Sequence, residues 1–175
     1  MAKTKSSRRP EGGENLYALP TSYVAIDTET TGLDFDFCDL IEVGAARVID
    51  GKITDTFDSL IHIDYPLDPF ITELSGITDD MLKDAPGLDR VISEFSDFAG
   101  DSVLMAHYAS FDMNFLYEAY KRILGHPLTN DYVDTLRVAR RAFPNLQHRR
   151  LTDLCKEFGI TNNHELMWLA NPRHA

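Results

Sequence analysis

The spacing of apolar residues predicts three strands in the first third of the chain. Residues 23–26 form a short apolar run, which indicates a buried strand. Residues 40–49 and 52–63 have further strand patterns, and the Asp50-Gly51 pair between them is a strong signal for a hairpin turn. We therefore expect these three strands to form an antiparallel meander.

The rest of the chain favours helices that alternate with short strands. Asp68 followed by Pro69 suits the start of a short helix, and Thr78 suits the cap of the next turn. Residues 88–98 carry apolar side chains at helical spacing, and Ser110 suits the N-cap of a later helix. Further strands are expected at 102–106 and 132–133, and further helices at 111–124, 135–143 and 151–158. This order predicts an α/β fold, with a mixed sheet between helices.

Length and composition suit one globular domain. The chain has 175 residues, of which 43% are hydrophobic, and this is enough for a sizeable core. Its two cysteines are far apart, so we expect reduced thiols and a cytoplasmic location. No apolar run approaches the length of a membrane span, so no membrane contact is expected. Residues 1–19 are basic and aperiodic, which predicts a flexible tail before a domain of residues 20–175.

Charge and candidate chemistry point in different directions. A formal net charge of −11 argues against a broad phosphate-binding surface, because nonspecific nucleic-acid binders are usually basic. Asp27 and Glu29, however, follow the first strand two residues apart, so their side chains point to the same side. Two such charges repel, and a hard divalent cation is the usual compensation. Two unrelated acids at a solvated strand end are the alternative.

The run Asp27-Thr28-Glu29-Thr30-Thr31-Gly32 resembles the first motif of the DnaQ-like (DEDDh) 3′→5′ exonucleases, which include the proofreading parts of bacterial DNA polymerase III. The resemblance implies a ribonuclease H-like fold with a five-stranded mixed sheet flanked by helices. It extends to a second motif around Asp112, which lies in the first turn of the helix expected after a strand. Tyr108 departs from this motif, because the family usually has Asn at that position.

The resemblance also implies roles for individual residues. Asp27, Glu29 and Asp112 correspond to ligands of two divalent ions, Mg²⁺ or Mn²⁺. Contacts to the nucleotide at the 3′ end are implied for Thr30, Thr31, Gly32, Leu33, Ser75, His107, Phe111 and Phe115. A structural role remains an alternative for His107, and a capped helical turn is an equally good explanation of the segment around Ser75.

The last motif of the family is incomplete in this sequence. His164 occupies the position of the catalytic histidine, but Leu169 stands where the final carboxylate is expected. We therefore expect the C-terminal helix to be incomplete, with the domain truncated or altered after about residue 163, and little activity from the chain as written. His148 and Asp153 have the same spacing as the missing pair and are an alternative, although they precede the expected place.

Two hypotheses follow. The first is a metal-dependent exonuclease that hydrolyses the terminal phosphodiester of single-stranded DNA 3′ ends and releases nucleoside 5′-monophosphates. DNA polymerase III subunits would be possible partners, and RNA is a possible substrate of the same fold. The second is a catalytically impaired module that binds nucleic acid or associates with a polymerase.

Overall fold

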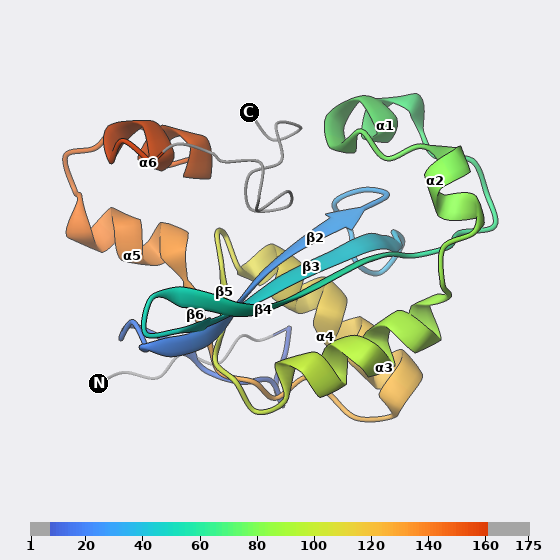
Figure 1. Cartoon of the computed structure of the whole chain (residues 1–175), viewed down its shortest axis with the longest axis horizontal. Coiled ribbons are helices and arrows are strands. Elements are labelled where there is room, and N and C mark those ends of the chain that lie inside the picture. The colour runs from blue at the N-terminus through green and yellow to red at the C-terminus, as the bar shows by residue number, and fades with distance from the viewer. Residues whose placement is uncertain (1–7, 161–175) are drawn as a thin grey trace.

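The computed structural model describes residues 8–160 as one six-stranded sheet with helices on both sides (Figure 1). The strands are β1 (Asn15–Leu16), β2 (Ser22–Thr30), β3 (Leu40–Ile49), β4 (Lys52–Leu60), β5 (Leu104–Ala106) and β6 (Tyr132–Asp134). The helices are α1 (Pro69–Ser75), α2 (Asp79–Lys83), α3 (Leu88–Ala99), α4 (Ser110–Leu124), α5 (Thr135–Ala142) and α6 (Leu151–Glu157).

The strand order is β1-β6-β5-β2-β3-β4. The segment β2-β3-β4 is the antiparallel meander expected from the sequence, and β5, β6 and β1 join it by parallel pairing. A mixed sheet flanked by helices is therefore confirmed, but it has six strands instead of five. The additional strand is β1, which pairs with β6 at the edge of the sheet.

The segment expected to be a flexible basic tail has a defined structure from Arg8 onward. Gly13 is essential for its course, because a Cβ atom there would lie 1.9 Å from the backbone oxygen of Asn130. Two short hydrogen bonds join Glu14 to the start of β6: its N–H donates to Asp131 and its C=O accepts from the N–H of Tyr132. Residues 8–19 thus lie against the domain. The expectation of a tail stands only for residues 1–7, which are outside the described range.

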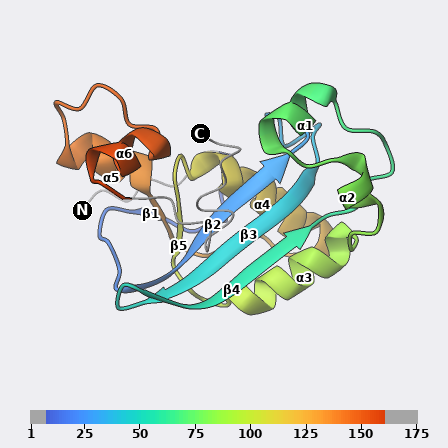
Figure 2. The same cartoon turned by 45° about the horizontal axis from the view of Figure 1, so that its top comes forward.

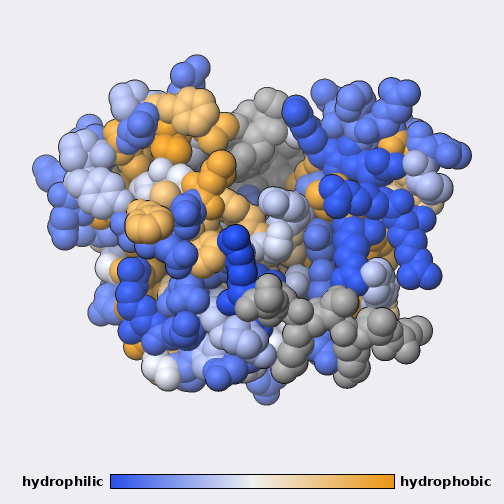
Figure 3. All heavy atoms as spheres, turned by 180° about the vertical axis from the view of Figure 1, so that it is seen from behind, coloured by the Kyte–Doolittle hydropathy of each residue, from blue (hydrophilic) through white to orange (hydrophobic). Residues whose placement is uncertain are grey.

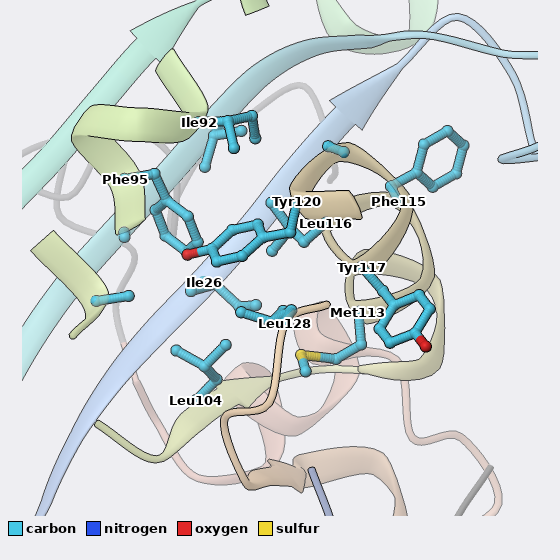
Figure 4. Close-up of a cluster of buried hydrophobic side chains, with 14 of the residues drawn as sticks. Ile26, Ile92, Phe95, Leu104, Met113, Phe115, Leu116, Tyr117, Tyr120 and Leu128 are labelled. Atoms are coloured by element: carbon cyan, nitrogen blue, oxygen red, sulfur yellow. The ribbon is translucent and has the colours of Figure 1, made fainter. Parts of the chain in front are cut away.

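The main core lies between one face of the sheet and the helices α3 and α4 (Figures 1 and 2). Phe95 of α3 and Tyr120 of α4 meet edge to face with ring centres 6.3 Å apart, above Ile26 of β2 and Leu104 of β5 (Figure 4). A second hydrophobic cluster, around Ile41, packs α1 and α2 against the N-terminal end of β3. The helices α5 and α6 lie on the other side of β2 from α1 (Figure 2).

Several element ends differ from the sequence prediction for local reasons. The third strand ends at Leu60 instead of Ile63, because the chain turns away and the N–H of His62 bonds Pro86. The predicted caps Asp68 and Thr78 are confirmed, since each accepts a hydrogen bond from its helix. The predicted cap Ser110 is wrong: the helix begins one residue earlier than expected, and Ala109 occupies the cap position without a side-chain bond.

Candidate active site

The acidic pair lies within β2, near its C-terminal end. β2 continues to Thr30, so Asp27 and Glu29 belong to the strand instead of following it. Its parallel neighbour β5 pairs only with Val24 and Ala25. Past that point the edge of β2 is free of a strand partner within the described residues. Side chains on this part of β2 can therefore reach the space beyond the end of β5.

Asp112 comes to the same place from α4. It lies in the first turn of that helix and is only 4% exposed. Thr28, between the two acids of β2, points to the core face and donates a hydrogen bond of 2.9 Å from Oγ1 to Oδ1 of Asp112. Side chains alternate along β2, so Thr28 points to the core face, where it bonds Asp112. Asp27 and Glu29 therefore leave the strand on the opposite side from Thr28.

Burial and charge both disfavour ionisation of Asp112. Burial raises the pKa of this carboxyl well above its ordinary value, and the negative charge of Asp27 raises it further. The hydrogen bond from Thr28 acts in the opposite direction, because it stabilises the charged form. A cation placed between Asp27 and Asp112 would remove the repulsion and favour both charged forms. Their oxygens are ligands that hard divalent ions prefer.

The register of the sheet adds further acids that sequence reasoning missed. Glu29 lies directly opposite Glu42 of β3, and Gly44, the partner of Asp27, lies opposite Asp58 of β4. Side chains at paired positions share a face, and like charges directly opposite destabilise a sheet. This face of the sheet therefore has a high density of negative charge around the β2 acids.

No group of three or more His, Cys, Asp or Glu side chains is gathered closely enough to hold a metal within residues 8–160. Asp27 and Asp112 interact as a pair, and Glu29 would have to join them. His148 and Asp153, the alternative pair for the last motif, also belong to no such group within the described part of the chain. His148 is exposed in the connection before α6, and Asp153 lies in the first turn of α6. His164 and Leu169 are outside the described residues, so the third motif stays a prediction.

His107 connects the two elements that begin beside the site. Its Nε2 lies 2.9 Å from the carbonyl oxygen of Arg149, and its Nδ1 lies 3.0 Å from Oγ1 of Thr135. A carbonyl only accepts, so the neutral ring carries its proton on Nε2 and leaves Nδ1 as an acceptor, which competes for the Thr135 hydroxyl proton with the carbonyl of Ala106 at 3.2 Å from that hydroxyl. Burial lowers the pKa of His107, which favours this neutral form. Both nitrogens are engaged within the chain, which favours the structural role over a substrate contact.

Tyr108 adopts a conformation that is uncommon for its residue type. Its φ of 64° lies in the left-handed region, and its side chain is 57% exposed. Its N–H donates to Oδ1 of Asp134, the residue that also caps α5. Asn tolerates this conformation better than Tyr does. The left-handed backbone conformation at this position therefore explains why the family usually has Asn there.

The loop between β2 and β3 presents two large apolar side chains to solvent, Leu33 and Phe37, the latter 86% exposed. Thr30 bonds the carbonyl of Gly32, and Oγ1 of Thr31 accepts from the N–H of Asp39. The Tyr65 hydroxyl donates to Asp39 at 2.6 Å and closes the loop from the other side. Leu33 is 87% exposed at the tip of this loop. The threonines thus shape the loop, and Leu33 and Phe37 are its large apolar side chains that remain accessible to a ligand.

The other residues with implied substrate contacts differ in accessibility. Ser75 is 1% exposed, and its hydroxyl bonds the backbone of Ile71 and Ile77 in and after α1. Phe115 is 4% exposed and packs against Phe111 with the two rings tilted and their centres 5.0 Å apart. Phe115 also lines a cavity of about 380 Å³ between α4 and the loop of residues 35–38. These positions favour packing for Ser75 and Phe115, and their substrate contacts stay predictions.

Arg9 is a further residue that sequence reasoning missed. It is 3% exposed, and its guanidinium donates to Asn114 Oδ1 and to the Tyr132 hydroxyl, each at 2.8 Å. A further bond of 3.4 Å reaches the carbonyl of Ser110. Arg9 therefore joins the first turn of α4, which carries Asp112, to β6. Its position in a basic segment of polar residues gave no local signal for this role.

Comparison with known proteins identifies the family. A family model described as Exonuclease matches residues 24–165, so the chain belongs to the exonuclease family. Over 150 residues the chain is 43% identical to the PolC-type DNA polymerase III of Bacillus subtilis (strain 168), which covers 84% of this chain. The corresponding protein of Streptococcus thermophilus (strain LMD-9) is 40% identical over 154 residues. In both cases the chain spans about a tenth of the relative's length.

Solved structures agree with this fold. Exonuclease X in complex with 5′ overhanging duplex DNA superimposes with a TM-score of 0.61 at 29% identity, covering 78% of this chain and 73% of that one. E. coli Exonuclease I in complex with a dA16 oligonucleotide gives a TM-score of 0.73 at 17% identity, covering 87% and 39%. The ribonuclease H-like exonuclease fold expected from the motifs is confirmed. Among the described helices, none has the length and apolar character that crossing a membrane requires.

Proposed function

We propose that this chain is a metal-dependent exonuclease that removes nucleotides from the 3′ end of single-stranded DNA. Nucleoside 5′-monophosphates would be its products, and DNA proofreading or repair its task. The observation that carries the proposal is the buried Asp112 beside the charged Asp27 in a member of the exonuclease family. A protein that keeps two carboxylates together at a cost to their ionisation is prepared for a cation.

The described residues divide the work between binding and support. Asp27, Glu29 and Asp112 would hold two Mg²⁺ or Mn²⁺ ions, and the charge of the ions would serve to activate water and to stabilise the departing 3′ oxygen. Thr28 orients Asp112 through its hydrogen bond. Leu33, exposed on the loop after β2, is placed to pack against the terminal base. The general base would be a histidine, and His164 is the candidate from the motif.

DNA as the substrate and a polymerase setting are supported by the relatives. The two relatives named above are PolC-type DNA polymerases, and the solved structures named above hold DNA. Because the chain spans only about a tenth of these polymerases, association with DNA polymerase III subunits is part of the proposal. A cytoplasmic location goes with it.

The test is cleavage of a 5′-labelled single strand in the presence of Mg²⁺ or Mn²⁺. A 3′→5′ exonuclease produces a ladder of labelled strands that shorten one nucleotide at a time, and EDTA stops it. Asp27→Asn should abolish the ladder. Asp101→Asn is the matched control, because it removes the same charge from the exposed loop before β5. That loop is at the N-terminal end of β5, whereas the candidate site lies beyond its C-terminal end.

Three other results would change the conclusion. Immediate release of a labelled mononucleotide would show the opposite polarity. Faster cleavage of RNA than of DNA of the same sequence would redefine the substrate. Tight binding of a strand without cleavage in either metal would favour the catalytically impaired binding module.

A further inference from the structure

Positive charge is concentrated in one segment of this acidic chain. Arg137, Arg140 and Arg141 lie on α5, and Arg149 and Arg150 lie just before α6. No Asp or Glu occurs between Asp134 and Asp153, although the whole chain has 28 acidic and 17 basic residues. Positive and negative charges are therefore unevenly distributed along the chain, and the net charge of −11 does not apply to every part of the surface.

Local structure explains only part of this cluster. Arg149 donates to the carbonyls of Phe143 and Pro144, where it closes the C-terminal end of α5. Cations in the last turn of a helix also interact favourably with its dipole, which suits Arg140 and Arg141. These two side chains and that of Arg150 are exposed, and within residues 8–160 none of them forms an ion pair with a carboxylate.

Tyr17 brings two of these arginines together. The guanidinium carbon of Arg137 lies 3.5 Å from the centre of the Tyr17 ring, and that of Arg141 lies 5.4 Å from it. The two arginines are one helical turn apart, so they share this ring on one side of α5. Two cations on one half-exposed aromatic ring form a site for an anion, and the ring edge can also contact a nucleobase.

The cluster begins next to the candidate active site. The His107 bonds to Thr135 and Arg149, and the Tyr108 bond to Asp134, attach both ends of the cluster to the turn from which α4 and Asp112 start. From there α5 leads away over eight residues, or about 12 Å. Figures 1 and 2 show α5 and α6 together on the side of β2 opposite α1. Viewed from behind, that side of the surface is mainly hydrophilic (Figure 3).

We propose that Arg137, Arg140, Arg141 and Arg150, together with Tyr17, bind the sugar-phosphate backbone of the single strand on the 5′ side of the nucleotide held at Asp27 and Asp112. This surface, which we call the arginine face, gives an acidic enzyme a local path for a polyanion. The inference rests on the proposed exonuclease function. It adds a binding surface for the part of the strand that is not being cleaved.

The experiment compares Arg140→Gln/Arg141→Gln with a control that removes two exposed cations elsewhere. Arg90→Gln/Arg122→Gln is suitable, because these residues lie on α3 and α4. Those helices cover the face of the sheet that is opposite to the arginine face. Binding of a fluorescent oligothymidine is measured in Ca²⁺ over a range of NaCl concentrations. Each lost phosphate contact should reduce the slope of log K against log salt by about 0.7.

The arginine-face variant should therefore have a slope smaller by about 1.4. At about 0.1 M salt, one decade below 1 M, this difference in slope corresponds to binding that is roughly 25-fold weaker. Cleavage of a dinucleotide, which has no backbone beyond the site, should stay within about twofold of wild type in both variants. The control variant should keep the wild-type slope.

Two results would overturn the inference. If wild type cleaves the strand and the two variants have equal slopes, the arginine face does not bind the backbone, and the proposed function stands. If wild type neither binds the oligothymidine nor cleaves the dinucleotide, the proposed function fails and the inference fails with it. Melting temperatures of both variants should stay within a few degrees of wild type, because the lost interactions are surface ones: the helix dipole for Arg140 and Arg141, the Tyr17 ring for Arg141, and the ion pair with Glu94 for Arg90.

Discussion

Replacing Arg9 with alanine should destabilise the domain strongly, although Arg9 belongs to a segment whose composition resembles that of a disordered tail. Its guanidinium is buried and makes two hydrogen bonds of 2.8 Å, to Asn114 and Tyr132. It also lies over the Tyr132 ring, 5.1 Å from the ring centre. The substitution removes these three interactions and the longer bond to the carbonyl of Ser110, and it leaves three polar groups of the domain without this partner.

The expected loss follows from these contacts. Hydrogen bonds that involve a charged group contribute about 1.5–3 kcal/mol each. A cation–π contact contributes about 0.5–2 kcal/mol. Because water can reach part of the space that the side chain leaves, we expect a total near 3–4 kcal/mol rather than the full sum. For a domain of this size that corresponds to a melting temperature lower by roughly 6–16 °C.

Thermal unfolding of Arg9→Ala, Arg9→Lys and Arg8→Ala tests this reasoning. Lysine keeps the charge but cannot reach both acceptors with a planar fork, so it should be intermediate. Arg8 is the neighbouring exposed cation, and its contact with the Phe35 ring at 5.6 Å should contribute less than about 1 kcal/mol. Equal melting temperatures for Arg8→Ala and Arg9→Ala would refute the assignment of Arg9 to the fold.

Two further predictions concern the turn beside the acids. The raised pKa of Asp112 means that the folded protein favours the protonated form of this carboxyl. The contribution of Asp112 to stability is therefore fully present below the pKa that it has in the unfolded chain, and it is lost as the pH rises through the pKa that it has in the folded protein. In EDTA, Asp112→Asn should therefore raise the melting temperature more at about pH 7.5 than at about pH 4.5; an equal effect at both would contradict the pKa direction. Tyr108→Asn should stabilise the protein by about 1 kcal/mol by relieving the left-handed backbone, measured by urea unfolding against Tyr108→Phe as control; no gain over Phe would show that no strain is stored there.

Local patterns predicted the elements well where the signal is local. The strand of residues 40–49 was expected with the ends that the structure has, because its apolar run is followed directly by the Asp50-Gly51 turn. The caps Asp68 and Thr78 were also readable, since a capping side chain bonds residues two or three positions away. Ser110 failed as a cap because the preceding Ala109 already has a helical conformation.

The candidate site was predictable only in part, for a related reason. Asp27, Glu29 and Asp112 stand in short motifs that the sequence displays directly. The facing pair of Glu29 and Glu42 depends on the register between β2 and β3, which shifts at Glu29 and Thr30. The partners of Arg9 are more than 100 residues away, and no local pattern indicates them. The support around the acids therefore had to come from the structure.

The contacts of Arg9 also constrain the order in which this domain can fold. Its bond to Tyr132 joins residues 123 positions apart, and β1 can pair only after β6 has formed. Contacts between distant segments form late, because closing long loops costs entropy before the contact compensates for it. During synthesis on the ribosome, the segment around Arg9 must therefore wait for β6 before Arg9 can attach the helix that carries Asp112. Nascent chains that stop short of residue 132 would lack this attachment, so assembly of the candidate active site is tied to synthesis of the domain at least as far as β6.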